Sequence, residues 1–575
     1  MEPISISGAG LTSPAFFPTF ACLFATFRNG IRSYEGYKVF RVNATNTATF
    51  EALKNVYHQE EFDFWSPPSM VSPTDILVPP QQISSIGAFF SLVGAKYEII
   101  NENVQFDVDF EQLNYIVRQE RASMSWNAYH RFETIQSWME SMAQQYPALV
   151  TIFTVGNSTE NRPLKVMKIS TGGAGSQKPA IWLDGGIHAR EWVAPATVSF
   201  IANELITQTV RKRQTRYIEA FDWYFDPMMN PDGYEYTHQF DRLWRKTRSG
   251  GKPILGGLFG CCKGTDPNRN WDHKWGGKGT SKNQCSQIYH GPSPASEPEV
   301  KAIQDFILDR KDQIKLFLTF HSYSQLLLLP WGYDNVRTDD HDELMRVGDK
   351  ALKALEKVHG TKYEGGATPE LLYPAAGGSH DWAKAVANIK FAYCYELRDK
   401  GRHGFTLPAN QIVPTGEETF AAVKSMADDM IDFYNISIPT TPSEGNRIFE
   451  TYTTDFEKTT EIISNPAAYA NISSSCSKDD QENCRVRFGE SKCDCRASSD
   501  LCFLPNHPKG QCTKFSGGVN CCERESCNKC CCCKEPVCEC MQLISCKRPN
   551  KPYGFCPGSF NIRCCNAPPE TQCTL

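Results

Sequence analysis

The stretch "DGGIHAREWVAPA" (residues 184–196) places three ionisable side chains within four residues, directly after a pair of glycines. The preceding segment "AIWLD" (180–184) is short and apolar, which predicts a buried strand. His188, Arg190 and Glu191 would then follow the end of that strand, at the edge of an α/β sheet where ligands bind. Ionisable groups in such a place are candidates for a functional site. We therefore expect the site of this protein to lie at the end of this strand.

An alternation of short apolar segments and helical patterns extends from residue 122 to residue 437. "KLFLTFHS" (315–322) and "FAYCYEL" (391–397) have the composition of buried strands, whereas "PEVKAIQDFILDRKD" (298–312) has apolar residues at helical spacing. Such alternation is typical of α/β domains. We therefore predict one α/β domain over residues 122–437, with a mixed, largely parallel twisted sheet and helices on both faces.

The residues before this domain predict two further parts. Residues 1–28 contain an apolar segment of signal-peptide length (11–27), so we expect a signal peptide there. Residues 29–121 begin with an alternating strand pattern, "YEGYKVFRV", and continue with a helical pattern, "TFEALKNVYHQEE", which predicts a small α/β domain. This domain ends in a polar connector, where a trypsin-like protease has two targets, Arg118 and Arg121.

Cysteine is concentrated at the C-terminal end, because 20 of the 25 cysteines lie in residues 476–575. The cysteine order of residues 493–522 returns with similar gaps in residues 538–565, which predicts two tandem modules. Disulfide bridges are the favoured interpretation, since a segment poor in large apolar residues needs covalent support. A metal–thiolate cluster is the alternative, suggested by "CNKCCCCK" (527–534). Residues 438–475, rich in Ser, Thr and Pro, are expected to form a linker.

Charge and composition exclude some classes of partner. The net charge is -5 and the isoelectric point is near 6.2, so no basic face is indicated for nucleic acid. After the leader, no run approaches the ~20 apolar residues of a transmembrane helix. The cysteine density and four glycosylation sequons favour an oxidising compartment. We therefore expect a secreted, extracellular monomer, with a tail that binds matrix, glycan or protein, or that acts as a spacer.

His188 and Glu191 form an H-x-x-E pattern, which alone is a weak metal signal because such pairs are often exposed. A catalytic zinc site needs three protein ligands and an open fourth position. His321 is the best candidate for the third ligand, since it lies at the end of an apolar strand, where an α/β sheet presents residues to a crevice. The alternative for His321 is a structural histidine in the core.

Three further segments favour the metal-site interpretation. Glu396 lies in an apolar segment, and a buried carboxylate next to a metal can act as a general base. Arginines occur in "RLWRKTR" (242–248) and "DPNRNWD" (266–272), and guanidinium groups bind carboxylates in bidentate fashion or stabilise an oxyanion. In "LLYPAAGGSHDW" (371–382), Tyr373 precedes small residues that leave room for a substrate.

Seven motifs occur in order along the chain. They are "DGGIHAREW", "NPDGYEYTH", "RLWRKTRS", "DPNRNWD", "HSYSQLLL", "AAGGSHDW" and "YELRDKGRHGF". In this order they resemble the pancreatic-type zinc carboxypeptidases of the A/B group, over about residues 122–435. The segment that begins with "YEGYKVFRV" resembles the inhibitory propeptide of that family. The resemblance does not cover the cysteine-rich tail.

The resemblance implies a zinc metallocarboxypeptidase, made as a zymogen, that hydrolyses the C-terminal peptide bond of peptides and proteins. One Zn²⁺ per catalytic domain would be bound by His188, Glu191 and His321, with water as the fourth ligand. Glu396 would act as the general base, and Arg245 would polarise the scissile carbonyl. The residues that the resemblance implies in substrate binding are Arg190, Asn268, Arg269, Tyr323 and Tyr373.

His380 departs from the family's pattern at the floor of the specificity pocket. In the family, an aliphatic residue there goes with apolar C-terminal residues, and an acidic one with Lys or Arg. His380 has no carboxylate, which argues against a preference for basic residues. A neutral imidazole suits aromatic or polar neutral residues, whereas a protonated one would accept Glu or Asp, and the ordinary pKa of histidine is about 6.5. We predict A-type specificity, for neutral, aromatic or aliphatic C-terminal residues.

Two more expectations follow from the resemblance. Cys262 and Cys285 match the disulfide of the family. The alternative to an enzyme is a secreted binding protein that has the same fold but no catalytic activity. Loss of a zinc ligand or of Glu396 would favour that alternative, and none of them is lost.

Overall fold

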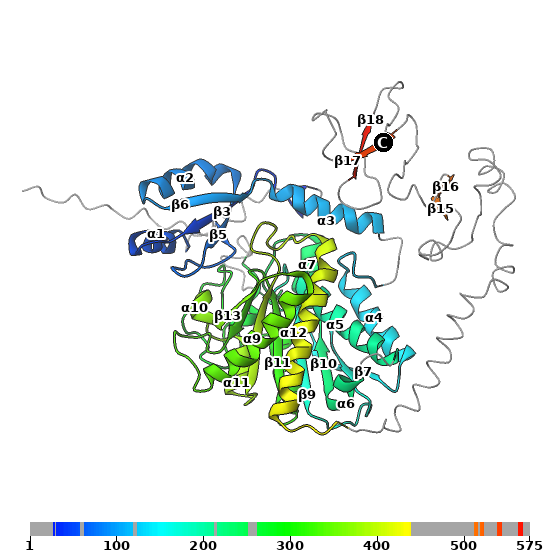
Figure 1. Cartoon of the computed structure of the whole chain (residues 1–575). Coiled ribbons are helices and arrows are strands. Elements are labelled where there is room, and N and C mark those ends of the chain that lie inside the picture. The colour runs from blue at the N-terminus through cyan, green and yellow to red at the C-terminus, as the bar shows by residue number, and fades with distance from the viewer. Residues whose placement is uncertain are drawn as a thin grey trace, which may run out of the picture. The chain divides into compact units, whose positions relative to one another are not determined.

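The computed structural model describes residues 27–28, 30–57, 62–118, 124–211, 215–250 and 262–438, together with residues 511–515, 518–522, 538–542 and 562–566 of the C-terminal tail. The chain divides into two compact units, residues 1–450 and residues 451–575. The first unit contains the large α/β domain and, before it, a small domain that contacts it. Figure 1 shows both domains in order along the chain, from blue to yellow.

The large domain is built on an eight-stranded sheet with the order β13-β12-β14-β11-β9-β10-β8-β7. Its four central strands β14, β11, β9 and β10 run parallel to one another, and β12 pairs antiparallel with β14 and parallel with β13. At the other edge β8 and β7 are antiparallel. The strands are β7 (Val150–Asn157), β8 (Pro163–Ile169), β9 (Ala180–Gly185), β10 (Asp222–Asp226), β11 (Ile314–Ser322), β12 (Leu326–Leu329), β13 (Glu364–Ala367) and β14 (Phe391–Leu397). The prediction of a mixed, largely parallel sheet is confirmed.

Helices cover both faces of this sheet (Figure 1). They are α4 (Phe132–Gln145), α5 (Val193–Val210), α6 (Arg216–Ala220), α7 (Pro231–Gln239), α8 (Pro298–Leu308), α9 (His341–His359), α10 (Thr368–Leu371), α11 (Ser379–Ala385) and α12 (Ile412–Phe433). On one face, Trp182 of β9 belongs to a buried core with Phe306 of α8 and Trp382 of α11. Because side chains alternate along a strand, Gly185 faces the other side, where a Cβ would lie 3.0 Å from Val198 of α5. Glycine at this position therefore lets α5 approach the end of β9 closely.

The small domain has a four-stranded antiparallel sheet, in the order β4-β5-β3-β6, with two helices packed on it. Its elements are β3 (Lys38–Asn43), α1 (Thr47–Tyr57), β4 (Asp63–Phe64), β5 (Thr74–Val78), α2 (Ile83–Leu92) and β6 (Lys96–Asn101), preceded by the short pair β1 (Phe27–Arg28) and β2 (Ile31–Arg32). A second apolar cluster joins Trp65 and Leu77 of this domain to Leu243 and Phe405 of the large domain. The small domain is therefore packed against the large one.

The connector between the two domains differs from the prediction. Arg118 was expected in a polar loop, but it is the last residue of helix α3 (Val104–Arg118). Val104, Val108 and Glu111 of this helix are buried, and their spacing is that of one helix face, so packing extends the helix beyond the apolar pattern that the sequence displays. The other expected cleavage residue, Arg121, lies outside the described residues, as do residues 1–26 of the expected signal peptide.

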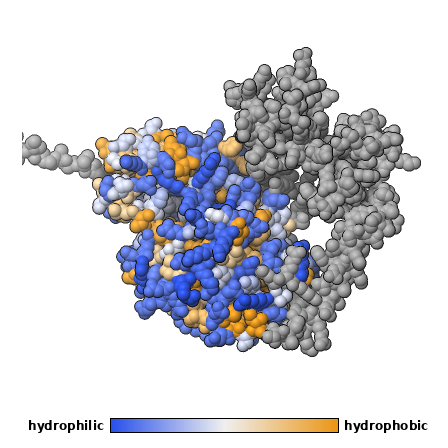
Figure 2. Space-filling model, viewed as in Figure 1, coloured by the Kyte–Doolittle hydropathy of each residue, from blue (hydrophilic) through white to orange (hydrophobic). Residues whose placement is uncertain are grey.

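In the tail the structure describes two pairs of antiparallel strands. β15 (Gln511–Phe515) pairs with β16 (Gly518–Cys522), and β17 (Cys538–Gln542) pairs with β18 (Ile562–Asn566). The predicted linker, apart from residue 438, the rest of the two predicted cysteine modules and the segment "CNKCCCCK" lie outside the described residues. Among the described helices, none combines the length and the apolar character that crossing a bilayer requires. Figure 2 shows that hydrophilic residues cover most of the visible face of the first unit, with apolar residues in separate small patches.

Candidate active site

A cavity of about 290 Å³ lies where the carboxyl ends of β11 and β14 meet the small domain. The large domain contributes ionisable residues from the segment after β9, from the residue that follows β11 and from β14. The small domain contributes Arg41, Trp65 and Asp75 to the opposite wall. The parallel strands therefore bring to one edge the groups that the sequence predicted there.

His188, Glu191 and His321 form a buried cluster, and the first two of them line this cavity. One ligand atom from each lies within 4.8 Å of the others. Glu191 Oε1 lies 2.8 Å from His188 Nδ1, and Glu191 Oε2 lies 3.0 Å from His321 Nδ1. The two Nδ1 atoms are 3.0 Å apart. Three predicted ligands from two distant segments are thus brought together.

The chemistry of this donor set fits a zinc ion. Two imidazole nitrogens and one carboxylate oxygen are ligands that zinc takes in catalytic sites, where a fourth position stays open. Burial opposes ionisation of Glu191, but His188 and His321 outweigh it and hold the pKa of Glu191 below its ordinary value. Burial lowers the pKa of His188, and Arg245 adds to this effect. Burial acts in the same direction on His321, but Glu191 outweighs it and raises the pKa of His321. An anionic carboxylate and a neutral imidazole are the protonation states that bind a metal.

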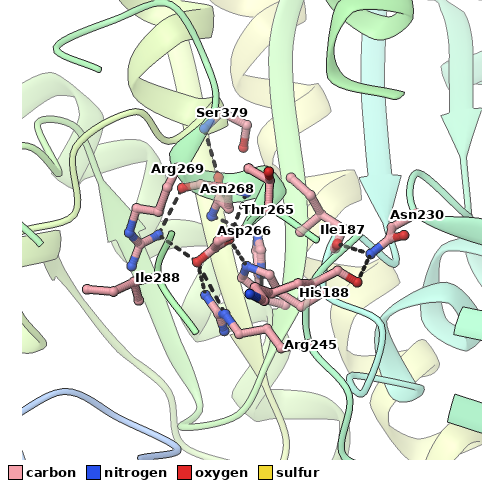
Figure 3. Close-up of polar contacts among 12 residues, drawn as sticks. Ile187, His188, Asn230, Arg245, Thr265, Asp266, Asn268, Arg269, Ile288 and Ser379 are labelled. Carbon is pink, nitrogen blue, oxygen red and sulfur yellow. Dashed lines mark hydrogen bonds and ion pairs between the residues drawn. The ribbon is translucent and has the colours of Figure 1, made fainter. Parts of the chain in front are cut away.

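Asp266 connects the metal cluster to the arginines (Figure 3). Its Oδ1 lies 3.1 Å from His188 Nε2, the ring nitrogen that faces away from the cluster. Its Oδ2 accepts hydrogen bonds from Arg245 Nη2 at 2.9 Å and Nε at 3.2 Å. Burial opposes ionisation of Asp266, but Arg245 and Arg269 hold its pKa well below the ordinary value. Asp266 therefore orients one predicted ligand and one predicted catalytic arginine together.

Glu396 lies beside the metal cluster because of the strand pairing. β11 and β14 are parallel, and His321 is the residue paired with Glu396. Burial raises the pKa of Glu396 to about 8, and Glu191 acts in the same direction, although His321 opposes them. A carboxyl group with a raised pKa in such a place suits proton transfer near neutral pH.

Asn268 and Arg269 are held rigidly at the wall of the cavity. Arg269 donates from Nε to Gly279 O and from Nη1 to Asn268 O, both at 2.8 Å. Asn268 Oδ1 accepts a hydrogen bond of 2.9 Å from Ser379 N, which Figure 3 also shows. Tyr373 lines the same cavity. Three of the predicted substrate-binding residues are thus in one wall.

Arg190 and Tyr323 contact the small domain. Arg190 does not belong to the wall of the cavity, since its Nη1 donates to Asp63 Oδ2 at 2.8 Å and its guanidinium lies 4.1 Å from the centre of the Phe405 ring. The Tyr323 hydroxyl lines the cavity and donates to Asp75 Oδ2 at 2.6 Å. Both predicted substrate-binding residues are therefore engaged by acidic groups of the small domain.

These acidic partners of Arg190 and Tyr323 were not predicted from the sequence. Asp75 lies in the strand "TDILV", where it is 2% exposed among apolar residues, and Arg41 donates to both of its oxygens at 2.7 Å. A carboxylate in the middle of an apolar strand is costly unless it is paired, so Asp75 carried a usable signal. Asp63 lies in a strand of only two residues, so its sequence context gave no comparable sign of a buried ion pair.

His380 lines the cavity together with an apolar wall of Leu326, Leu328, Leu372 and Cys394. Burial lowers the pKa of His380 to about 3, and His321 adds to this effect. The imidazole is therefore neutral at physiological pH. Cys394 is a free, buried thiol whose pKa burial raises.

The disulfide between Cys262 and Cys285 is present. It joins the residues before Asp266 to the loop that leads to α8. The segment that carries Asp266, Asn268 and Arg269 therefore has a covalent support close to its start.

Taken together, an α/β sheet with a buried His–Glu–His cluster, a carboxyl group of raised pKa and buried arginines defines a metal-dependent hydrolase. Comparison with family models is more specific, since the one described as zinc carboxypeptidase matches residues 135–422 and the one described as carboxypeptidase activation peptide matches residues 40–111. The chain belongs to the zinc carboxypeptidase family. It is a zinc-dependent hydrolase that carries an activation peptide, as predicted.

Individual relatives include both A and B types. The chain is 48% identical to carboxypeptidase B of Astacus astacus over 312 residues, which is 54% of this chain and 100% of that protein. It is 41% identical to carboxypeptidase A2 of Mus musculus over 407 residues, which is 70% of this chain and 95% of that protein. Among solved structures, thrombin activatable fibrinolysis inhibitor is similar with a TM-score of 0.62 at 34% identity, covering 69% of this chain and 98% of that one.

Proposed function

We propose that this chain is a secreted zymogen whose catalytic domain removes neutral, aromatic or aliphatic residues from the C-termini of peptides and proteins. The observation that carries this proposal is one cavity, lined by Glu396, Arg245 and Arg269 beside an apolar wall, that opens on the His–Glu–His cluster through His188 and Glu191. The fold and the family support the reaction, and the cavity supports the specificity.

His188, Glu191 and His321 hold the zinc ion in this proposal, and Asp266 orients His188 from behind. When bound, zinc supplies Lewis-acid chemistry, which polarises a carbonyl group and acidifies water. The side chains of the protein then transfer the protons and bind the charged groups of the substrate.

Glu396 accepts the proton of the attacking water and later delivers it to the leaving amine. Its pKa of about 8 makes it a good proton acceptor and donor near neutral pH. Arg245 is fixed by Asp266 at 2.9 Å and faces the same cavity, so it donates to the carbonyl oxygen of the scissile bond as negative charge develops there.

Arg269, Asn268 and Tyr373 bind the terminal carboxylate of the substrate. The contacts of Arg269 with Gly279 O and Asn268 O fix the plane of its guanidinium, and a fixed plane favours bidentate binding of a carboxylate. An internal peptide segment would leave this buried charge unpaired, which costs about 3 to 5 kcal/mol. The enzyme therefore acts on chain ends.

The preference for neutral residues rests on the pocket wall. Leu328, Leu372, Cys394 and His380 offer no carboxylate to a basic side chain. The pKa of about 3 keeps His380 uncharged, which also removes the cation that an acidic side chain would need. The 48% identity with carboxypeptidase B of Astacus astacus favours a second candidate, a preference for basic residues, and the test must separate the two.

The small domain, residues 29–121, acts as the activation peptide of the catalytic domain, residues 122–437. Its Asp63 and Asp75 hold Arg190 and Tyr323, which we assign to the substrate subsites. A trypsin-like protease that cuts after Arg118 or Arg121 would separate the two domains. Residues 1–28 act as the signal peptide, and residues 476–575 attach the enzyme to matrix, glycan or protein through the linker 438–475.

The test uses the full chain, secreted from cells and cut with trypsin. The substrates are peptides that differ only in the last residue, with Phe, Leu, Lys and Glu, and each is also supplied with a C-terminal amide. We expect cleavage after Phe and Leu, little after Lys and Glu, none of the amides, and loss of all activity with a zinc chelator. Equal cleavage after Lys would contradict the neutral preference, and chelator-resistant cleavage would contradict the metal role.

A further inference from the structure

The imidazole of His380 is held by two neighbours on one side of the ring. His380 Nε2 lies 3.3 Å from Thr368 Oγ1 and 3.4 Å from Asp381 Oδ1. Thr368 stands at the start of α10, and Asp381 lies in α11 with His380. The Nε2 edge of the ring is therefore turned toward the protein.

Both neighbours of Nε2 are hydrogen-bond acceptors. The hydroxyl of Thr368 has one proton, which it donates to Leu329 O at 3.2 Å. Asp381 accepts the backbone N–H of Gly332 on both oxygens and that of Tyr333 on Oδ2, at 2.8 to 3.0 Å. A nitrogen between two acceptors must carry a proton to avoid repulsion, so His380 has its proton on Nε2.

The other ring nitrogen, Nδ1, is consequently a bare acceptor. Among the residues that the structure describes, Nδ1 has no hydrogen-bond partner, although His380 is only 4% exposed. A Cβ on Gly378 would lie 3.7 Å from this nitrogen, and Gly378 and His380 both line the cavity. A buried acceptor without a partner is unfavourable, so the pocket favours an occupant that donates to it.

We infer that the pocket selects C-terminal residues whose side chains donate a neutral hydrogen bond, with His380 Nδ1 as the acceptor. The substrate class is then amide, phenol or hydroxyl side chains, in preference to apolar side chains of the same shape. This inference rests on the proposed function, because it assigns the pocket to the last residue of the substrate.

Charged side chains fit this pocket less well. The ammonium of Lys is also a donor, but it would leave water for a wall of Leu328, Leu372 and Cys394 without a carboxylate to pair with. An ionised Glu only accepts hydrogen bonds, so it would face the lone pair of Nδ1. Neutral donors satisfy the acceptor without either penalty.

The experiment measures kcat/KM for pairs of peptides whose last residues have the same shape: Tyr with Phe, Gln with Met, and Asn with Leu. The trypsin-cut full chain is assayed at about pH 8, where Asp381, whose pKa burial raises to about 7, is ionised. We expect the donor member to be preferred about tenfold in at least one pair, as one extra hydrogen bond to a buried acceptor allows.

Three variants locate the acceptor. His380→Leu should abolish the donor preference and improve the apolar member of each pair. Thr368→Val should keep the preference, because Asp381 still accepts the Nε2 proton. His359→Leu, the same change at a histidine of α9 away from the cavity, is the matched control and should behave as the parent enzyme.

The outcomes separate this inference from the proposed function. Activity on all peptides without a donor preference in any pair overturns the role of Nδ1 and leaves the carboxypeptidase assignment intact. A preference that survives His380→Leu, or that disappears in Thr368→Val, also overturns it, since the recognising atom would then be another one. Absence of chelator-sensitive hydrolysis of every peptide would instead overturn the proposed function.

Discussion

The Tyr323 hydroxyl donates a hydrogen bond of 2.6 Å to Asp75 of the activation peptide, which is 248 residues away along the chain. The same domain places Asp63 at 2.8 Å from Arg190. Two acidic side chains of one domain thus bind two side chains that we assign to the substrate subsites of the other. Latency of the zymogen should therefore depend on specific polar contacts as well as on coverage of the cavity.

Asp75→Ala should raise the activity of the uncut zymogen. The substitution removes the contact with Tyr323 and leaves the charge of Arg41 unpaired, and breaking a buried ion pair costs about 3 to 5 kcal/mol. We expect the activity of the uncut chain on a small peptide to rise at least tenfold, while the trypsin-cut enzyme stays unchanged. Glu102→Ala, which breaks the exposed pair with Lys38, is the control. Equal latency in both variants would contradict the role of Asp75.

His188→Ala should remove both zinc and activity. It deletes one of the three convergent ligand atoms, and a catalytic zinc site rarely holds its ion with two protein ligands. We expect kcat to fall by about 10³-fold or more and the zinc content to fall below one ion per chain. Metal analysis and peptide hydrolysis on the same preparation provide the measurement. A variant that lacks zinc but keeps its activity would exclude the metal role.

Asp266→Asn should weaken zinc binding without removing a ligand. Asp266 holds His188 Nε2 at 3.1 Å and Arg245 at 2.9 Å, and its charge holds both partners in place. Loss of such an outer partner typically reduces metal affinity or activity about 10- to 100-fold. Titration with a competing chelator measures the affinity, and kcat/KM measures the effect on Arg245. Unchanged values of both would show that Asp266 only supports the loop.

Arg269→Gln should lower the selectivity for free chain ends. The substitution removes the charge that we assign to the terminal carboxylate, for which we expect a loss of roughly 10²- to 10³-fold in kcat/KM on free-acid peptides. Peptides with a C-terminal amide should be cleaved as poorly as before, so the ratio between acid and amide falls. Arg337→Gln, which changes an exposed arginine paired with Glu370, is the matched control. An unchanged ratio would assign the carboxylate to another residue.

Glu299→Gln should stabilise the enzyme at neutral and alkaline pH. Burial raises the pKa of Glu299 from 4.5 to about 7, so ionisation is harder in the folded state than in the unfolded one. The contribution of Glu299 to the free energy of unfolding therefore falls by up to about 3 kcal/mol as pH rises from 4.5 to about 7, and it is constant above that range. Gln keeps an oxygen for Thr159 N, the partner at 2.8 Å. Thermal unfolding should give equal midpoints near pH 4 and a higher midpoint for the variant near pH 8.

One result would contradict the role of the Glu299 charge. A difference in midpoint that is as large near pH 4 as near pH 8 would mean that the amide acts through packing and not through the charge. Glu417→Gln, at an exposed carboxylate paired with His359, serves as the control and should change little at either pH.

The metal cluster was predictable because its residues lie in patterned segments. His188 and Glu191 follow a strand that the apolar pattern identifies, and His321 and Glu396 lie in two other such strands. Parallel strands end at the same edge, so the four residues had to meet. Helix α3 was not predicted, because the sequence around Arg118 indicates only a polar connector, whereas the packing of Val104 and Val108 favours a helix that ends at Arg118.

Contacts between distant segments were not predictable in the same way. The hydrogen bond of Asp75 to Tyr323 and the contact of Thr368 with His380 join side chains whose own segments do not identify the partner. Thr368 lies in "ATPEL", where a threonine before proline suits any turn. Which neighbours surround His380, and hence which of its nitrogens carries the proton, depends on the whole fold.

The pairing of β11 with β14 sets the distance between His321 and Glu396, the proposed zinc ligand and proton acceptor, through hydrogen bonds of the main chain. A slip of one residue would bring Tyr395 or Leu397 opposite His321 and turn Glu396 to the other face of the sheet. Substitutions elsewhere that leave this register intact therefore preserve the spacing of the pair in the course of evolution.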